Sequence, residues 1–238
     1  GLSVVEVVRT PQGLTPVMGR YNRRITADTP FAVTGPAAGS ASLKTAAGPT
    51  GRTVTGTLNN CSGGLTPWGT VLSGEENFNN YFGATDGAAA PTPADADRWK
   101  RYGIKLKPSE RKWERFDPRF DLTATPNEVN RFGYVVELNP WDPTSTPVKH
   151  TALGRFKHEA ATTVVASNGK VVFYLGDDER FDYVYKFVTA GTYDPEDRAA
   201  NLDLLDEGTL YVAKFAEDGS FEWLPLVHGQ GPLTVANG

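Results

Sequence analysis

Residues 161–175 read ATTVVASNGKVVFYL and give the clearest structural signal in the chain. Two β-rich runs, 161–167 and 170–175, flank the pair Asn168-Gly169. Both residues of this pair tolerate the positive φ angles that a two-residue hairpin turn requires. The stretch therefore predicts a β-hairpin, and a third run at 183–188 predicts the strand that follows it.

The same kind of signal recurs along the chain. Residues 209–215 and 221–224 flank a turn at Asp218-Gly219, and residues 132–138 form another candidate strand, ended by Asn139-Pro140. Gly and Pro are plentiful, with 25 and 17 residues, so the apolar runs between them are short. Short strands in consecutive meanders predict a mostly β protein, and they are typical of propeller blades and of sandwiches alike. No sharp repeat decides between the two.

Residues 84–130 differ from this pattern. They open with an Ala- and Pro-rich run at 88–93 and carry a charged stretch at 98–119. Residues 95–102 predict a short helix, and the remainder predicts a long surface excursion whose charges face solvent. A lid over a functional site is the alternative role for this segment.

Composition argues against several classes of function. The 24 Lys and Arg residues face 28 Asp and Glu residues without any long basic block, so nucleic acid is not an expected partner. No apolar run approaches the roughly 20 residues that span a bilayer, so no membrane partner is expected. The single cysteine, Cys61, cannot form an internal disulfide, and three histidines argue against a His-rich zinc site. A nucleophile elbow, a phosphate-binding glycine loop and a His-Glu-x-x-His motif are all missing.

Three polar stretches supply candidate metal ligands, and the first is 59–77. Cys61 stands among Asn, Ser and Gly, which predicts a polar turn and favours a ligand or nucleophile role over that of a small buried apolar residue. A predicted strand at 68–73 then leads to the adjacent acids Glu75 and Glu76. Because side chains alternate along a strand, only one of them should point at the site, and the sequence leaves open which one.

The second and third stretches add further acids. In 149–160, Lys157 and Glu159 share one face if the chain is extended, and His158 lies on the other. A carboxylate beside an ammonium can bind a metal and a phosphate oxygen together, although an exposed ion pair on an edge strand is the simpler interpretation. Residues 176–182 place acids where a strand ends, which suits Ca²⁺ but lacks the spacing of an EF-hand loop.

Taken together and in order, these stretches resemble the PhoX family of alkaline phosphatases. The resemblance extends over nearly the whole chain apart from 84–130. It rests on residues 21–25, 34–39, 61–77, 81–83, 130–137, 151–160, 176–178, 182–187 and 208–226.

The resemblance implies an all-β fold, a six-bladed β-propeller with iron and calcium in its axial site. Residues 1–238 would then be the N-terminal portion of one propeller domain, with a long insertion at about 84–130. Cys61 is the implied iron-bridging ligand. Glu76, Glu159 and Asp178 are the implied carboxylate ligands of the metal cluster. Lys157 is the implied catalytic residue and would face the phosphate.

The function implied by the resemblance is hydrolysis of small-molecule phosphate monoesters, in which an iron and calcium cluster activates a bridging oxide or hydroxide. Family members are much longer, so the missing C-terminal half of the same propeller is the expected partner. The family also implies export by the twin-arginine route to the periplasm or the extracellular space. Two alternatives stay open: a calcium-binding propeller that acts as a non-catalytic binding module, and a propeller hydrolase that uses calcium alone. Iron together with calcium would favour the phosphatase.

Overall fold

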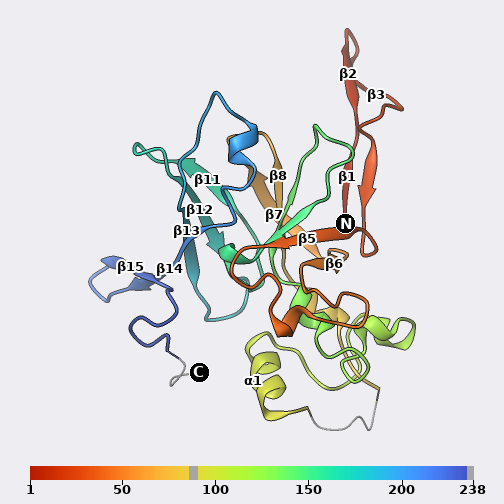
Figure 1. Ribbon diagram of the computed structural model, residues 1–238, viewed down its shortest axis with the longest axis vertical. Coiled ribbons are helices and arrows are strands. Elements are labelled where there is room, and N and C mark those ends of the chain that lie inside the picture. Colours follow the sequence, from red (N-terminus) through yellow and green to blue (C-terminus); the bar gives the residue numbers. More distant parts are fainter. Residues whose placement is uncertain (86–90, 235–238) are drawn as a thin grey trace.

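The computed structural model describes residues 1–85 and 91–234, and Figure 1 shows how their elements are arranged. The strands are β1 (Leu2–Val4), β2 (Val7–Thr10), β3 (Gly13–Pro16), β4 (Arg23–Ile25), β5 (Pro30–Thr34), β6 (Thr53–Thr55), β7 (Asn60–Leu65), β8 (Val71–Glu75), β9 (Val135–Leu138), β10 (Val148–His150), β11 (Thr162–Val165), β12 (Val171–Gly176), β13 (Val184–Thr189), β14 (Gly208–Phe215) and β15 (Phe221–Pro225). The helices are α1 (Pro93–Arg101) and the short 3-10 turns η1 (Ala41–Leu43), η2 (Phe78–Tyr81), η3 (Trp113–Arg115), η4 (Pro118–Phe120), η5 (Glu128–Arg131), η6 (Thr151–Leu153) and η7 (Ala199–Asn201).

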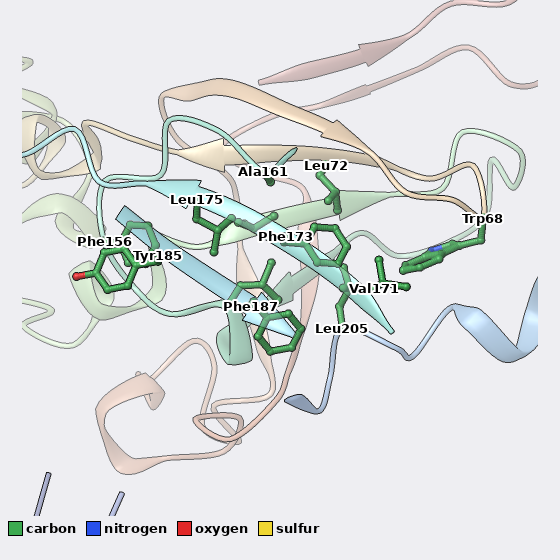
Figure 2. Packing of buried hydrophobic residues seen from close by; sticks show 12 residues of the cluster. Trp68, Leu72, Phe156, Ala161, Val171, Phe173, Leu175, Tyr185, Phe187 and Leu205 are labelled. Atoms are coloured by element: carbon green, nitrogen blue, oxygen red, sulfur yellow. The ribbon is translucent and has the colours of Figure 1, made fainter. Parts of the chain in front are cut away.

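The five-stranded sheet is the meander that the sequence predicts. Its order is β11-β12-β13-β14-β15, with every neighbouring pair antiparallel. The predicted turn at Asn168-Gly169 joins β11 to β12, where Val164 lies opposite Val172. Phe173 and Phe187 are fully buried on the inner face. In Figure 2 they belong to one apolar cluster with Leu72 of β8, so the core lies between this sheet and the other large one.

The six-stranded sheet joins parts of the chain that are far apart in sequence. Its order is β6-β5-β10-β9-β8-β7, so β10 lies between β5, to which it is parallel, and β9, to which it is antiparallel. The two small ribbons β1-β4 and β2-β3 pair separately. The predicted strand at 132–138 is present as β9, and the one at 68–73 is present as β8 but is shifted toward the acids.

Residues 84–130 are more than a surface excursion, because several of their apolar side chains are buried together with residues outside the segment, such as Leu58 and Phe132. Most charged side chains of 98–119 are nevertheless exposed, as predicted. Among the described residues 84–85 and 91–130, the predicted helix is α1, capped by Thr92, whose Oγ1 accepts a hydrogen bond from the Asp95 amide. Trp99 and Ile104 are buried with Phe82 and Phe120 in a second apolar cluster. The packing of these side chains attaches the segment firmly to the sheets.

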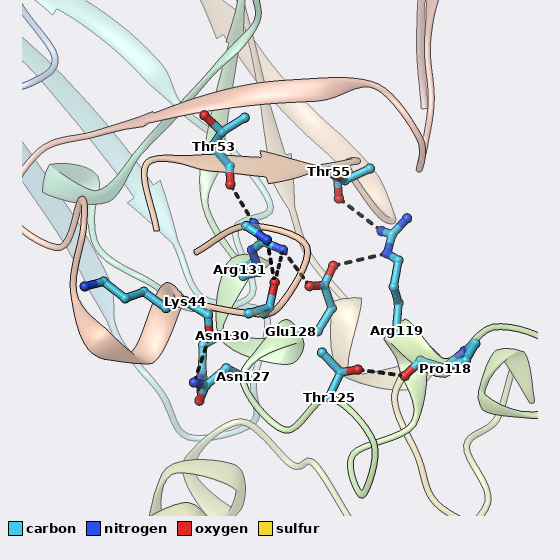
Figure 3. Close-up of polar contacts among 12 residues, drawn as sticks. Lys44, Thr53, Thr55, Pro118, Arg119, Thr125, Asn127, Glu128, Asn130 and Arg131 are labelled. Atoms are coloured by element: carbon cyan, nitrogen blue, oxygen red, sulfur yellow. Dashed lines mark hydrogen bonds and ion pairs between the residues drawn. The ribbon is translucent and has the colours of Figure 1, made fainter. Parts of the chain in front are cut away.

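Charged side chains within the same segment are also used for structure. Figure 3 shows the buried Glu128 carboxylate between Arg119 and Arg131, 3.2 Å and 2.7 Å from their guanidinium groups. The two arginines donate to the backbone carbonyls of Thr55 and Thr53 in β6, at 3.0 Å and 2.6 Å. This network fixes the end of the segment to the edge of the six-stranded sheet.

The protein is therefore mostly β, as predicted. Within residues 1–85 and 91–234 the two sheets do not close into a ring of blades. In this part of the chain, no helix has both the length and the apolar character needed to cross a bilayer.

Candidate metal centre

Three distant stretches of sequence meet where β8 and β12 end. Residues 157–159 run between them in extended form. The His158 amide donates to the carbonyl of Glu75 at 3.2 Å, on the β8 side. On the β12 side, the Asp178 amide donates to the carbonyl of Lys157 at 3.1 Å, and His158 lies opposite Asp177. Because residues directly opposite share a face, this register puts Lys157, Glu159 and Asp178 on one face and His158 on the other.

Gly74 makes this close meeting of strands possible. A Cβ atom on Gly74 would lie only 2.2 Å from the carbonyl oxygen of His158. Any other residue at position 74 would push residues 157–159 away from β8.

Cys61 lies in a strand, so the prediction of a polar turn is wrong. It belongs to β7, whose pairing with β8 shifts between Asn60 and Gly63. Asn60 lies opposite Glu75 and Gly63 opposite Ser73, so Cys61 and Ser62 together face Gly74. This β-bulge re-aims a side chain at the sheet edge, which is a common feature next to functional sites. The polar setting of Cys61 comes from the bulge.

The structure decides which of the two adjacent glutamates reaches the site. Glu75 is fully buried, and its carboxylate accepts hydrogen bonds from Lys149 Nζ at 2.7 Å and from the Gly133 amide at 3.0 Å. Glu76 points the other way and interacts with Cys61 and with acids of the second and third stretches. Glu75 is therefore structural, and the alternation expected from the sequence holds at this position.

The Cys61 thiol and three carboxylates gather at this point. Side-chain hydrogen bonds join Glu76 to Asp178 and to Cys61, and the charge of Glu159 acts on both Glu76 and Cys61. Burial, followed by the hydrogen bond with Asp178, raises the pKa of Glu76. A backbone hydrogen bond from Ser62 lowers the pKa of the Cys61 thiol, but burial and the Glu76 carboxylate outweigh it, and the net shift is upward. A bound cation would relieve this crowding of acidic groups.

The donor chemistry fits iron and calcium, the metals that the family resemblance implies. A thiolate suits iron, and carboxylates suit both iron and calcium. Asp178 and Glu159 are exposed to solvent and Cys61 is half-buried, so an ion could reach the site. Within residues 1–85 and 91–234, however, no three His, Cys, Asp or Glu side chains are positioned to hold a metal ion. Cys61, Glu76, Glu159 and Asp178 therefore form a donor set, a group of neighbouring ligand side chains, but not a complete coordination shell.

Lys157 lies beside this set, with its ammonium paired to Glu179. The two side chains form a direct ion pair, and this contact is the main cause that lowers the pKa of Glu179. Lys157 is largely buried, whereas about a third of the Glu179 side chain is exposed. Asp178 and Glu179 thus have different partners, but strand alternation is not the reason, because β12 ends at Gly176 and the chain bends at Glu179.

The 84–130 segment contacts the same acidic loop. Arg101, the last residue of α1, lies 2.8 Å from Asp182 and 3.3 Å from Asp177 through its guanidinium nitrogens. The next residue, Tyr102, places its ring 3.9 Å from the guanidinium carbon of Arg155. The segment therefore borders the candidate site.

A second buried polar network was not predicted. His150 Nε2 lies 2.7 Å from Glu137 Oε2, and His150 Nδ1 lies 3.3 Å from Asp206 Oδ1. Burial opposes protonation, but the hydrogen bonds and charges of Asp206 and Glu137 outweigh it and raise the pKa of His150 to about 9. The sequence offered only the adjacent pair Lys149-His150 as a signal, because the partners of His150 lie far away in the sequence.

Fold and site together define a β-sheet protein with an open acidic and thiol-bearing site at its strand ends. The family model for alkaline phosphatase PhoX matches residues 1–238. The chain therefore belongs to the PhoX alkaline phosphatase family. None of the curated proteins matches it.

A solved structure agrees with this assignment. The chain is similar to Pseudomonas fluorescens PhoX, solved in complex with vanadate, a transition state analogue, with 45% sequence identity and a TM-score of 0.93. The match covers 100% of this chain and 42% of the Pseudomonas chain. The protein thus spans less than half the length of this relative.

Proposed function

We propose that this chain is the N-terminal portion of a metal-dependent alkaline phosphatase, which hydrolyses phosphate monoesters in a six-bladed propeller exported from the cell. The observation that carries the proposal is the gathering of Cys61, Glu76, Glu159 and Asp178 beside Lys157. The similarity to a phosphatase that binds vanadate supports it.

The charge of the site supports a metal-dependent reaction. Three carboxylates and a thiol surround the position next to Lys157, and a phosphate monoester is itself a dianion. Without cations, repulsion would outweigh attraction to the single ammonium of Lys157. Iron and calcium, when bound, would neutralise the phosphate and supply the activated oxygen that attacks phosphorus.

The residues of this chain would then have separate roles. Cys61, Glu76, Glu159 and Asp178 hold the cations, and the bulge in β7 keeps the thiol turned toward the carboxylates. Lys157 donates hydrogen bonds to a phosphate oxygen and stabilises the charge of the transition state. Its pair with Glu179 keeps the ammonium positioned until the phosphate arrives.

The test measures metal content and hydrolysis of p-nitrophenyl phosphate by the full-length protein. We expect iron and calcium in the purified protein, loss of hydrolysis after chelation, and recovery when both metals are returned. The chain of 238 residues, purified by itself, should bind metal weakly and hydrolyse the ester negligibly, because four ligands cannot satisfy several ions when each calcium alone takes about six to eight oxygens. Full-length protein that carries both metals and still leaves the ester intact would overturn the proposal.

Metal analysis also tests the alternatives. Calcium without iron, together with hydrolysis, would favour a hydrolase that uses calcium alone. Calcium without any turnover would favour a binding module. The thiol of Cys61 argues against both the calcium-only hydrolase and the binding module, because calcium prefers oxygen ligands to a thiolate.

A further inference from the structure

A polar cavity of about 340 Å³ lies between η2 and residues 103–110. Its lining includes Asn79, Asn80, Lys105, Lys107, Ser109 and Glu110. None of these residues belongs to the donor set described above, so the cavity is a separate feature of the surface.

The cavity adjoins the candidate catalytic residue. Gly103 forms part of its wall, and a Cβ atom there would lie 3.4 Å from Asn79 Nδ2 and 3.8 Å from Glu179 Oε2. Glu179 in turn pairs with Lys157. A single side chain therefore separates the wall of the cavity from the ammonium of Lys157.

The backbone around the cavity is held in place before any ligand binds. The Ala84 amide donates to the Lys107 carbonyl at 3.0 Å, and the Arg111 amide donates to the Asn80 carbonyl at 3.1 Å. The Ser109 hydroxyl donates to the buried Glu114 carboxylate at 2.6 Å. Such a framework lowers the cost of ordering a binding site.

The polar groups of the cavity are suited to an anion that also carries hydroxyl groups. Lys105 and Lys107 are exposed, and within the described part of the chain neither ammonium has an ion pair. The carboxylate of Glu110 is already paired with Arg111, at 3.6 Å. Among residues 1–85 and 91–234, the buried Asn79 Oδ1 has no hydrogen-bond partner, so it can accept from a ligand hydroxyl.

We propose that this cavity holds a second anionic group of the substrate, a phosphate or carboxylate on a hydroxylated leaving group, while the reacting phosphate lies at Lys157. This inference rests on the proposed phosphatase function. The two lysines bind the distal anion, and Asn79 accepts a hydroxyl of the same moiety. The site would then prefer polyanionic esters of sugars or nucleosides to simple monoesters.

The test compares two substrates in the full-length enzyme: fructose 1,6-bisphosphate, which has a second anion, and p-nitrophenyl phosphate, which lacks one. In the double variant Lys105→Gln/Lys107→Gln we expect KM for the bisphosphate to rise about tenfold, a difference of about 1.4 kcal/mol. The kcat for the bisphosphate, and both constants for the monoester, should stay unchanged. Both lysines are exposed, so the variant should fold normally.

The matched control is Lys44→Gln/Lys100→Gln, which removes the same charge from exposed positions outside this cavity and should leave both substrates unaffected. A similar rise in KM for both substrates, or the same rise in the control, would reduce the effect to general electrostatics and overturn the inference. An unchanged KM for the bisphosphate in the double variant would also overturn it. Failure of the wild-type enzyme to hydrolyse the monoester would instead count against the proposed function.

Discussion

The Nζ atom of Lys149 lies 2.7 Å from Oε1 of Glu75, and both side chains are fully excluded from solvent. The ammonium also donates to the carbonyl of Arg131 at 2.9 Å and lies 4.0 Å from the ring centre of Phe132. Burial lowers the pKa of Lys149, and the carboxylate of Glu75 opposes that shift. The pair joins β8 to β10 across β9, so it connects the strand that leads to the site with the centre of the sheet.

The Lys149→Met variant should lower the free energy of unfolding by about 3–5 kcal/mol, because it leaves the Glu75 charge buried and unpaired. The neighbouring Glu76→Gln should change it by less than about 1 kcal/mol, because Glu76 is half-buried among acids. Urea denaturation of both variants measures the difference. Equal losses would contradict the structural role assigned to Glu75.

The Cys61→Ser variant should lose iron and slow phosphate ester hydrolysis by about tenfold or more, with the β-sheet signal in circular dichroism unchanged. A hydroxyl is a harder and weaker ligand for iron than a thiolate. Ser62→Ala is the matched control, because Ser62 lies in the same bulge. Normal iron content in the Cys61 variant would contradict the assigned ligand.

The Glu159→Gln and Asp178→Asn variants should each weaken metal retention during dialysis, whereas Glu179→Gln should retain metal normally. Glu159 and Asp178 both raise the pKa of Glu76, whereas Glu179 forms an ion pair with Lys157. Elemental analysis after dialysis gives the readout. Equal metal loss in all three variants would mean that the different partners of these acids do not separate their roles.

The stability of the protein should fall as pH rises from 6.5 to about 9. The pKa of His150 is about 9 in the folded state and about 6.5 when unfolded, so its contribution is complete below 6.5 and is lost through the folded pKa. The total loss should be roughly 3 kcal/mol, since each pKa unit corresponds to about 1.4 kcal/mol.

The Asp206→Asn variant tests this origin of the pH dependence. It removes one of the two carboxylates that hold the proton on His150, so the decline in stability should still begin near pH 6.5 but should end at lower pH and be smaller. Urea unfolding across this pH range measures the change. A pH profile that is the same in the variant and the wild type would assign the effect to other groups.

Local chemistry explains which features the sequence predicted well. The hairpin at 161–175 depends on Asn168-Gly169, so no distant partner is needed to recognise it. Alternation predicts that Glu75 and Glu76 face opposite ways. It does not show which of them faces the site, because Lys149, the partner of Glu75, lies in another strand. Cys61 looked like a turn residue because a bulge is defined only against the strand it pairs with. The buried aromatic side chains of residues 84–130 were missed because they are interspersed among charges that are exposed.

The position of β10 also sets an order of events during synthesis. Thr34 in β5 and His150 in β10 touch although 116 residues separate them. Until residues 148–150 leave the ribosome, β5 and β9 cannot join, and the carboxylate of Glu75 lacks its cation. Such non-local pairing slows folding, because the entropy of closing a long loop is lost before any stabilising contact forms. Ribosomes that stall before residue 148 would therefore release a nascent chain with two open strand edges, a substrate for chaperones and proteases.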